Sequence, residues 1–247
     1  MATDETLAQG DAKAYQTSEA ALGSHAARLN SLRAAVLGAN DGIVSTAGLV
    51  IGVAGATTNA VTILLAGVAG LTAGALSMGV GEYVSVSAQK DTEKALLDQE
   101  RRELAEMPDE ELAELAGLYE AKGLSPELAL EVATQLHEHD ALSAHAETEL
   151  GIDPEELTSP TVAAVSSAVA FTFGSALPVL SIVLAPPEFR IPVTVVAVVV
   201  ALMLTGFLSA RVSGTNAVRA VIRVVLGGLL AMGVTYWIGR LVGHNLG

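Results

Sequence analysis

The sequence has no cysteine, few aromatic residues and few charged residues for a chain of 247. The lack of cysteine excludes disulfide bonds, thiolate metal ligands and a cysteine nucleophile. Charged residues make up 16% of the chain, whereas soluble domains average about 25%. Hydrophobic residues reach 51% and the mean hydropathy is +0.50. These values are typical of a protein that lies partly in a lipid bilayer.

The negative charge is concentrated in one segment. The net charge of −14 excludes a nucleic-acid-binding surface, which needs to be basic. Residues 91–156 hold 20 Asp and Glu against four Lys and Arg, which gives −16 and leaves the rest nearly neutral. Residues 1–29 are polar and lack the apolar core of a signal peptide, so we expect a mobile or amphipathic tail there.

Five segments are long and apolar enough to form transmembrane helices, which need about 20 residues at 1.5 Å each. They are residues 32–56, 60–88, 160–185, 191–210 and 217–242. The expected fold is an all-α membrane protein with transmembrane helices 1–2 in residues 30–88, helices 3–5 in 158–247, and an acidic insert in 89–157. Within the insert we expect three helices: the end of helix 2, one from Pro108, and one from Ser125-Pro126 to about Leu150.

The cations predict the orientation. With five spans, 11 of the 13 Lys and Arg lie on the side of the N-terminus and insert, and only Arg190 and Arg240 lie opposite. The positive-inside rule therefore predicts a cytoplasmic N-terminus and insert and an outside C-terminus. A composition rich in Ala, Val and Gly and poor in Lys suggests a prokaryotic cytoplasmic membrane.

Small residues recur at helical spacing in the first two segments, where they allow close backbone approach in lipid. The stripes are Gly38, Asp41, Ser45, Gly48 and Gly52 in the first, and Gly67, Gly70, Gly74, Ser77, Gly81 and Ser85 in the second. Ordinary helix packing explains them, but we also expect a homodimer built on these faces, with Gly48 and Gly74 in the interface.

Three side chains in these segments are candidates for an ion pathway. Asp41 lies near the middle third of the bilayer, where a carboxylate costs about 2.5–3.5 kcal/mol unless it meets a partner, a cavity or an ion. Met78 offers a soft sulfur to a transition metal, and Glu82 follows one turn later. The alternatives are a hydrogen-bonded structural Asp, a methionine that only fills space, and a glutamate that reaches water.

Carboxylates in the insert are spaced to share helical faces. Glu100 and Glu103 are three residues apart, as are Glu111 and Glu114. Together with Glu149 they would form an oxygen cluster of the kind that holds metal in di-iron bundles. His137, His139 and His145 add imidazoles, which suit iron, zinc or nickel. A solvated acidic helix surface is the alternative.

The stretches Leu37–Ile43 and Ser77–Tyr83 and the acidic insert resemble the vacuolar iron transporter family over about residues 30–243. The resemblance implies five transmembrane helices, a homodimer, and export of Fe²⁺ from the cytosol in exchange for protons. Some members also carry Mn²⁺ or Co²⁺.

The resemblance also implies site residues. Asp41 and Met78 match the family's intramembrane pathway, and the five insert glutamates (Glu100, Glu103, Glu111, Glu114, Glu149) match its metal-binding carboxylates. The sequence departs from the family pattern in two respects. His145 and Ala146 stand in place of methionine ligands, and Gly70 replaces an intramembrane carboxylate, whereas Glu82 stands where some members have Gly.

The function expected is therefore metal–proton antiport, with divalent metal ions, protons, the bilayer and a second copy of the chain as partners. No cofactor is expected beyond the transported or bound metal. A membrane-bound ferroxidase-like enzyme and a metal sensor are the alternatives. The sequence lacks the paired Glu-x-x-His motifs of ferritin-like bundles, a nucleophile elbow and a phosphate loop, so we expect no enzyme.

Overall fold

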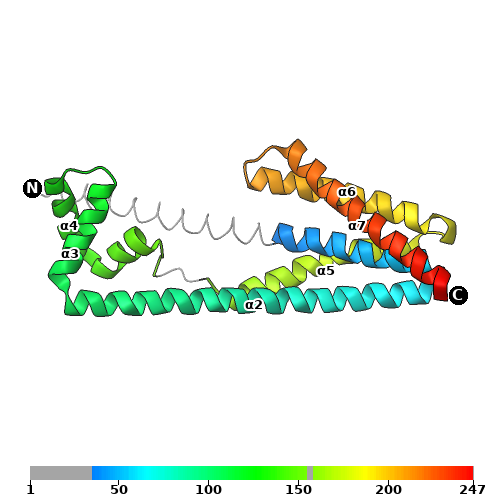
Figure 1. Ribbon diagram of the computed structural model, residues 1–247, viewed down its shortest axis with the longest axis horizontal. Coiled ribbons are helices and arrows are strands. Elements are labelled where there is room, and N and C mark those ends of the chain that lie inside the picture. The colour runs from blue at the N-terminus through cyan, green and yellow to red at the C-terminus, as the bar shows by residue number, and fades with distance from the viewer. Residues whose placement is uncertain (1–34, 155–157, 247) are drawn as a thin grey trace, which may run out of the picture. The chain divides into compact units, whose positions relative to one another are not determined.

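The structure is a computed structural model that describes residues 35–154 and 158–246, so the predicted tail 1–29 lies outside the described residues (Figure 1). The described residues form helices and short connections, and no strand occurs among them. The helices are Ala35–Ala56, α2 (Ala60–Glu106), α3 (Pro108–Ala121), α4 (Pro126–His145), the π-helix η1 (Ala146–Leu150), α5 (Pro160–Leu184), the 3₁₀-helix η2 (Pro187–Phe189), α6 (Arg190–Val212) and α7 (Ala217–Leu246).

Five of the helical segments in the described part of the chain are long and apolar enough to cross a membrane. They are Ala35–Ala56, α2, α5, Pro187–Val212 and α7. Each overlaps one of the five predicted segments, so the all-α architecture with five candidate spans is confirmed. The chain is a multi-pass membrane protein.

Helix α2 is too long to lie wholly within a bilayer. Its 47 residues extend about 70 Å at 1.5 Å per residue, more than twice the roughly 30 Å of the hydrocarbon core. The side chain of Asn59 caps the start by accepting from the backbone N–H of Val61 and Thr62 at 2.9 and 3.2 Å. Glu100, which is 40 residues further along, therefore lies beyond the membrane-spanning part of the helix.

The chain divides into two compact units. The first unit comprises Met1–Tyr83 and Thr161–Gly247, and the second unit comprises Val84–Pro160. The first contains the apolar helices and the second contains the end of α2 with α3, α4 and η1.

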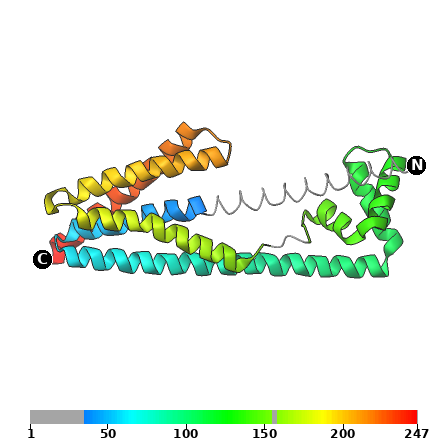
Figure 2. The ribbon, with the colours of Figure 1, turned by 180° about the vertical axis from the view of Figure 1, so that it is seen from behind.

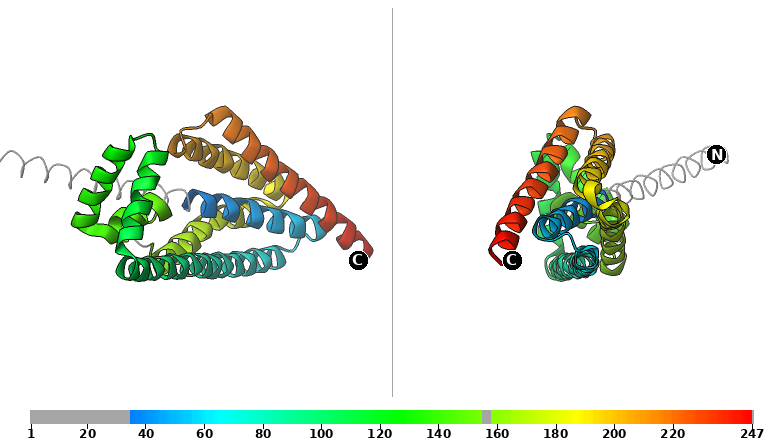
Figure 3. Two further views of the ribbon diagram at one scale, coloured as in Figure 1. Left: turned by 60° about the vertical axis from the view of Figure 1, so that its left-hand side comes forward. Right: turned by 90° about the vertical axis from the view of Figure 1, so that its right-hand side faces the viewer.

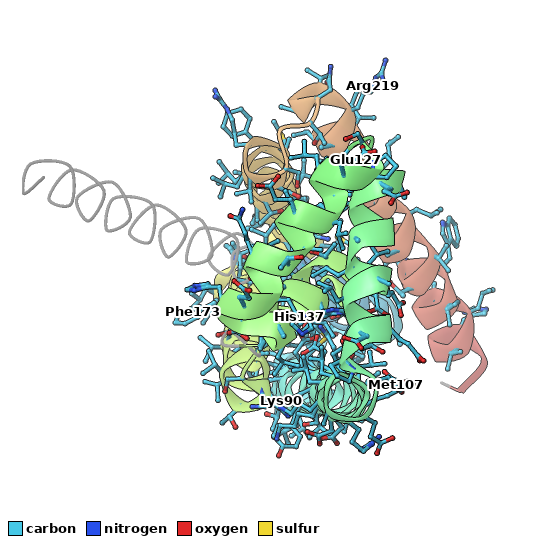
Figure 4. All side chains as sticks on the ribbon, turned by 90° about the vertical axis from the view of Figure 1, so that its left-hand side faces the viewer. Lys90, Met107, Glu127, His137, Phe173 and Arg219 are labelled. Carbon is cyan, nitrogen blue, oxygen red and sulfur yellow. The ribbon has the colours of Figure 1, made fainter. Side chains whose placement is uncertain are left out.

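The core of the first unit is built around the helix Ala35–Ala56. This helix contributes more buried residues to the core than any other, and all four other long helices add to it. The buried side chains are Ile43, Ala47, Val50, Ile51, Ile63, Val179, Ile182, Val198, Ala201, Leu202 and Met232. The side chains that point outward are also apolar, as Phe173 on α5 shows at 76% exposure (Figure 4). Such an apolar exterior suits contact with lipid.

Glycines bring the helix Ala35–Ala56 close to α5 and α7. A Cβ at Gly42 would lie 3.0 Å from the backbone nitrogen of Ser175, and Gly174 and Gly239 lie against the backbone of Ala39 and Gly52. Because small residues permit such approach in lipid, these contacts hold the first helix between α5 and α7.

The two glycines expected at a subunit interface contact helices of the same chain instead. A Cβ at Gly48 would lie 3.6 Å from Cγ2 of Thr235 on α7, and one at Gly74 would meet the ring of Phe171 on α5. Gly48 and Gly74 therefore pack within the subunit, and the homodimer expected on these helix faces stays a prediction. Close spacing of small residues marks tight helix packing, and it does not distinguish a neighbour in the same chain from one in a partner.

Helices α6 and α7 pack along each other in the first unit (Figure 2). Gly214, with φ of 62°, makes the turn between them, and the Asn216 side chain accepts from the N–H of Arg219 at 3.1 Å. Pro192 lies in the first turn of α6. Its missing N–H costs no helical hydrogen bond there.

The second unit is a small helical cluster in which α3 packs against α4 (Figure 3). Its core holds Leu115, Ala116 and Ala133. Ser125 caps α4 as expected, because its Oγ accepts from the N–H of Leu128 at 3.4 Å, and Pro126 is the first helical residue.

Helix α4 differs from the expected continuous helix to Leu150. Asp140 has non-helical angles (φ −158°, ψ 93°), and its carboxylate accepts from the N–H and Oγ of Ser143 at 3.1 and 2.7 Å. Asp140 therefore interrupts the helix and caps the turn that follows. A π-helix then carries the chain to Leu150, and Gly151 ends it with φ of 64°.

Candidate metal centre

Three elements of the second unit bring together two carboxylates and one imidazole. Glu100 comes from α2, Glu111 from the first turn of α3, and His145 is the last residue of α4. All three are buried, and one ligand atom from each lies within 4.8 Å of the others. Nδ1 of His145 is 3.0 Å from Oε1 of Glu100 and 3.7 Å from Oε2 of Glu111. Carboxylate oxygen and imidazole nitrogen are ligands for divalent ions.

Glu149 adds a third carboxylate at the edge of this group. Its Oε2 lies 3.8 Å from Nδ1 of His145, and its side chain is 32% exposed. The π-helix supplies Glu149 four residues after His145, so both side chains reach the same site. We name Glu100, Glu111, His145 and Glu149 the carboxylate–histidine centre.

Three buried atoms of this centre lack hydrogen bonds. They are Oε1 of Glu100 and both ring nitrogens of His145, although Nδ1 of His145 lies 3.0 Å from Oε1 of Glu100. Buried polar atoms are nearly always paired, and leaving one unpaired costs about 1–3 kcal/mol. A bound cation would accept lone pairs from Oε1 of Glu100 and from one ring nitrogen of His145.

Electrostatics also favours a cation there. Burial, followed by the charges of Glu149 and Glu111, raises the pKa of Glu100 to about 7. The pKa values of Glu111 and Glu149 are raised as well, first by burial and then by neighbouring carboxylates. Burial lowers the pKa of His145, so its imidazole is neutral and free to coordinate. A divalent ion bound in the centre would offset the repulsion among its crowded carboxylates.

Glu103 and Glu114, the other two predicted ligands, lie outside the close group. Both are near enough for their charges to raise the pKa of Glu100 and Glu111. Glu103 also accepts from Nε2 of Gln99 at 3.0 Å, and Glu114 is exposed. They therefore add negative potential around the centre.

The three histidines that the sequence offered as imidazole ligands take different positions. His145 is fully buried in the centre, and the ring of His137 lies 6.0 Å from the ring of His145. His139 is exposed. Helix spacing alone did not separate them, because the break at Asp140 lies between His139 and His145.

A second polar site lies in the first unit, where a cavity of about 250 Å³ opens between the helix Ala35–Ala56, α2 and α5. Its lining residues are Asp41, Ser45, Thr46, Leu49, Gly70, Gly74, Ser77, Met78 and Phe171. The structure thus brings Asp41 and Met78, paired in the sequence analysis, to one cavity. Glu82 lies one turn beyond Met78, is half-buried, and is not among the lining residues.

Sequence reasoning missed Thr46 and Phe171 in this cavity. Thr46 Oγ1 donates to Ser175 Oγ at 2.9 Å, and Ser175 Oγ donates to the carbonyl of Gly42 at 3.2 Å. The only signal in the sequence was the run Ser45-Thr46, four to five residues after Asp41 and thus on adjoining faces of the helix. Phe171 follows no local pattern, since it reaches the cavity from α5.

The fold and these two sites define a multi-pass membrane protein with a cavity lined by Asp41 and Met78 among its apolar helices, and an acidic centre in its second unit. Residues 32–240 match the VIT family. The chain is 44% identical over 212 residues to "Vacuolar iron transporter" of Acanthamoeba castellanii, covering 85% of this chain and 78% of that protein. It is 36% identical to "Vacuolar iron transporter homolog 4" of Arabidopsis thaliana, covering 88% and 87% of the two chains. The chain belongs to the VIT family.

A rice relative extends the same similarity. "Vacuolar iron transporter homolog 1" of Oryza sativa subsp. japonica is 37% identical over 224 residues, which cover 90% of this chain and 78% of that protein. These relatives come from an amoeba and from plants, so the prokaryotic membrane suggested by composition stays a prediction.

Proposed function

We propose that this protein is a divalent metal transporter that exports Fe²⁺, and also Mn²⁺ or Co²⁺, from the cytosol in exchange for protons. Its relatives are named vacuolar iron transporters. The observation that carries the proposal is the carboxylate–histidine centre, in which Oε1 of Glu100 and both ring nitrogens of His145 are buried without hydrogen-bond partners. Transport, with no chemical change to the ion, is the function we assign.

The proposed domains carry out different steps of transport. Residues 89–157 face the cytosol and collect the ion on Glu100, Glu111, His145 and Glu149, with Glu103 and Glu114 attracting it. Residues 30–88 and 158–247 form the pathway. This arrangement is supported by the charge of −16 carried by residues 91–156 and by the apolar helices elsewhere.

The pathway runs through the cavity lined by Asp41 and Met78. Asp41 supplies the negative charge that a cation needs among apolar helices. The sulfur of Met78 favours Fe²⁺, a softer ion than Mn²⁺ or Mg²⁺, and Glu82 lies on the approach, one turn away on the same helix. A proton arriving from outside neutralises Asp41 and releases the ion, which couples the two fluxes. The working unit is a homodimer.

Purified protein in sealed proteoliposomes tests the proposal. An anaerobic Fe²⁺ gradient across vesicles that contain a trapped fluorescent chelator should give flux that a proton gradient accelerates. Mn²⁺, Co²⁺ and Zn²⁺ are measured in parallel, with protein-free vesicles as control.

The other two functions predict different results in the same vesicles. Oxidation of Fe²⁺ without flux would establish a ferroxidase-like enzyme, and binding without flux or oxidation would establish a sensor. Either result would overturn the transport assignment.

A further inference from the structure

His137 lies closer to the carboxylate–histidine centre than its sequence position suggests. It precedes His145 by eight residues, which on a straight α-helix separates the two Cα atoms by about 12 Å along the axis. The ring centroids are nevertheless 6.0 Å apart, with the ring planes at 78°. The break at Asp140 lies between them and shortens this separation. Figure 4 labels His137 on α4.

Unpaired buried atoms are concentrated at this place. Among the described residues, five buried side-chain nitrogen or oxygen atoms have no hydrogen-bond partner. Four of them are Oε1 of Glu100, Nδ1 of His137, and Nδ1 and Nε2 of His145. A fully buried imidazole with two unpaired nitrogens is unusual, since buried polar groups are normally satisfied. A metal ion, which accepts lone pairs from several directions at once, would satisfy Oε1 of Glu100, Nδ1 of His137 and one ring nitrogen of His145.

The separation of the two rings permits a shared ion. A ring nitrogen holds Zn²⁺ at about 2.0–2.1 Å, which places the ion about 3.2 Å from the ring centroid. Two rings on one ion are therefore at most roughly 6.4 Å apart, and the observed 6.0 Å lies within that limit.

We propose that His137 is a second imidazole ligand of the carboxylate–histidine centre, which makes it selective for borderline divalent ions over hard ones. Two nitrogens and two buried carboxylates suit Zn²⁺, Co²⁺ and Fe²⁺, whereas Mn²⁺, Mg²⁺ and Ca²⁺ prefer oxygen alone. The inference rests on the metal-binding role proposed above and names the residue that sets its selectivity.

The direct test counts imidazoles on the bound ion. Full-length protein in detergent receives one equivalent of Zn²⁺, and X-ray absorption measures the imidazole scattering. Wild type should show two imidazoles per Zn²⁺, and His137→Gln should show one. His139→Gln is the matched control, because His139 is exposed two residues further along the same helix. One imidazole in the wild type would overturn the proposal, and that reading needs no variant to fold.

Selectivity is the second readout. Competition titrations should show that His137→Gln lowers the affinity for Co²⁺ by about tenfold or more and changes that for Mn²⁺ much less, while His139→Gln changes neither. An unchanged ratio of Co²⁺ to Mn²⁺ affinity in folded His137→Gln protein would overturn the assignment.

Transport measurements separate this inference from the proposed function. A wild type that binds Zn²⁺ through two imidazoles but moves no ion removes the proposed function and leaves this inference standing.

Discussion

Thr46 on the first helix donates its hydroxyl proton to Ser175 on α5 at 2.9 Å, and Ser175 donates its own proton to the carbonyl of Gly42. Both side chains are buried, with Thr46 only 2% exposed. Because the hydroxyl proton of Thr46 is used in this hydrogen bond, only the lone pairs of Oγ1 remain for a further partner. Because Thr46 also lines the cavity that holds Asp41, its oxygen is fixed as an acceptor for a cation.

Thr46→Val tests this arrangement, because it keeps the side-chain shape and removes the oxygen. We expect a loss of about 1 kcal/mol of stability from the broken hydrogen bond. Fe²⁺ flux should fall about fivefold, which corresponds to about 1 kcal/mol of lost ion stabilisation. Thermal unfolding and proteoliposome flux measure the two effects. Thr72→Val is the control, since Thr72 is exposed and bonds only to the carbonyl of Val68 in its own helix; equal flux loss in both variants would contradict the role of Thr46.

Asp41→Asn keeps the shape of the side chain and removes the charge among the apolar helices. We expect flux of every divalent ion to fall by about 100-fold, or about 2.7 kcal/mol, and proton coupling to disappear. Metal binding by the second unit should remain, because its ligands lie on other elements. Asp98→Asn neutralises a carboxylate paired with Arg101 far along α2 and should transport normally. Wild-type flux in folded Asp41→Asn protein would remove Asp41 from the pathway.

Met78→Leu removes only the sulfur from the cavity and keeps its apolar volume. Because thioether sulfur is a ligand for softer ions, we expect Fe²⁺ flux to fall more than Mn²⁺ flux. The ratio of the two initial rates, measured in the same vesicle preparation, is the readout. Leu76→Met, which places sulfur on an exposed outer position of α2, should leave the ratio unchanged. A constant ratio in Met78→Leu would mean that Met78 only fills space.

Much of the fold was predictable because each membrane span is a long, mostly apolar segment of the sequence. Bilayer thickness sets a length of about 20 apolar residues, and the five segments found by that rule overlap the five candidate spans. Local chemistry also gave the start of α4 at Ser125-Pro126, since a helix cap depends on neighbours within four residues.

The parts that the sequence could not give depend on contacts between distant residues. Gly48 and Gly74 pack against Thr235 and Phe171 of the same chain, which no local pattern indicates. The i,i+3 spacing placed Glu100 beside Glu103 and Glu111 beside Glu114, yet only one member of each pair is buried in the centre. Spacing tells which side chains share a helical face, and the tertiary packing decides which part of that face turns inward.

The break at Asp140 should be necessary for the carboxylate–histidine centre. Asp140→Ala removes the acceptor for the N–H and Oγ of Ser143, and alanine favours a continuous helix. We expect His145 to leave the centre and the affinity for Zn²⁺ to fall about tenfold or more, as measured by calorimetry. Glu131→Ala, at an exposed position of α4, is the matched loss of one negative charge. Unchanged Zn²⁺ affinity in Asp140→Ala would show that the ligands assemble without the break.

Metal binding should depend on pH through Glu100, whose pKa is raised to about 7 by burial and by neighbouring carboxylates. Below about pH 7 an ion must displace a proton from this group, so affinity should fall as the pH is lowered toward 6 and level off above 8. In the metal-free protein the stability changes with pH in the opposite direction from the metal affinity. The carboxyl is protonated more readily in the folded than in the unfolded chain, where its pKa is 4.5. Its contribution to stability is therefore fully present below pH 4.5 and is lost as the pH rises through about 7.

Glu100→Gln isolates both effects, since glutamine imitates the protonated acid at every pH. The variant should bind Mn²⁺ weakly, with little change between pH 6 and 8, whereas wild-type affinity rises by up to about tenfold per pH unit below 7. Without metal, the stability of wild type relative to Glu100→Gln should fall between pH 5 and 7.5. His145 titrates in the opposite sense, because its lowered pKa adds stability as the pH rises to 6.5. The difference between wild type and Glu100→Gln cancels that contribution. Equal pH dependence of Mn²⁺ affinity in the two proteins would assign the titrating group elsewhere.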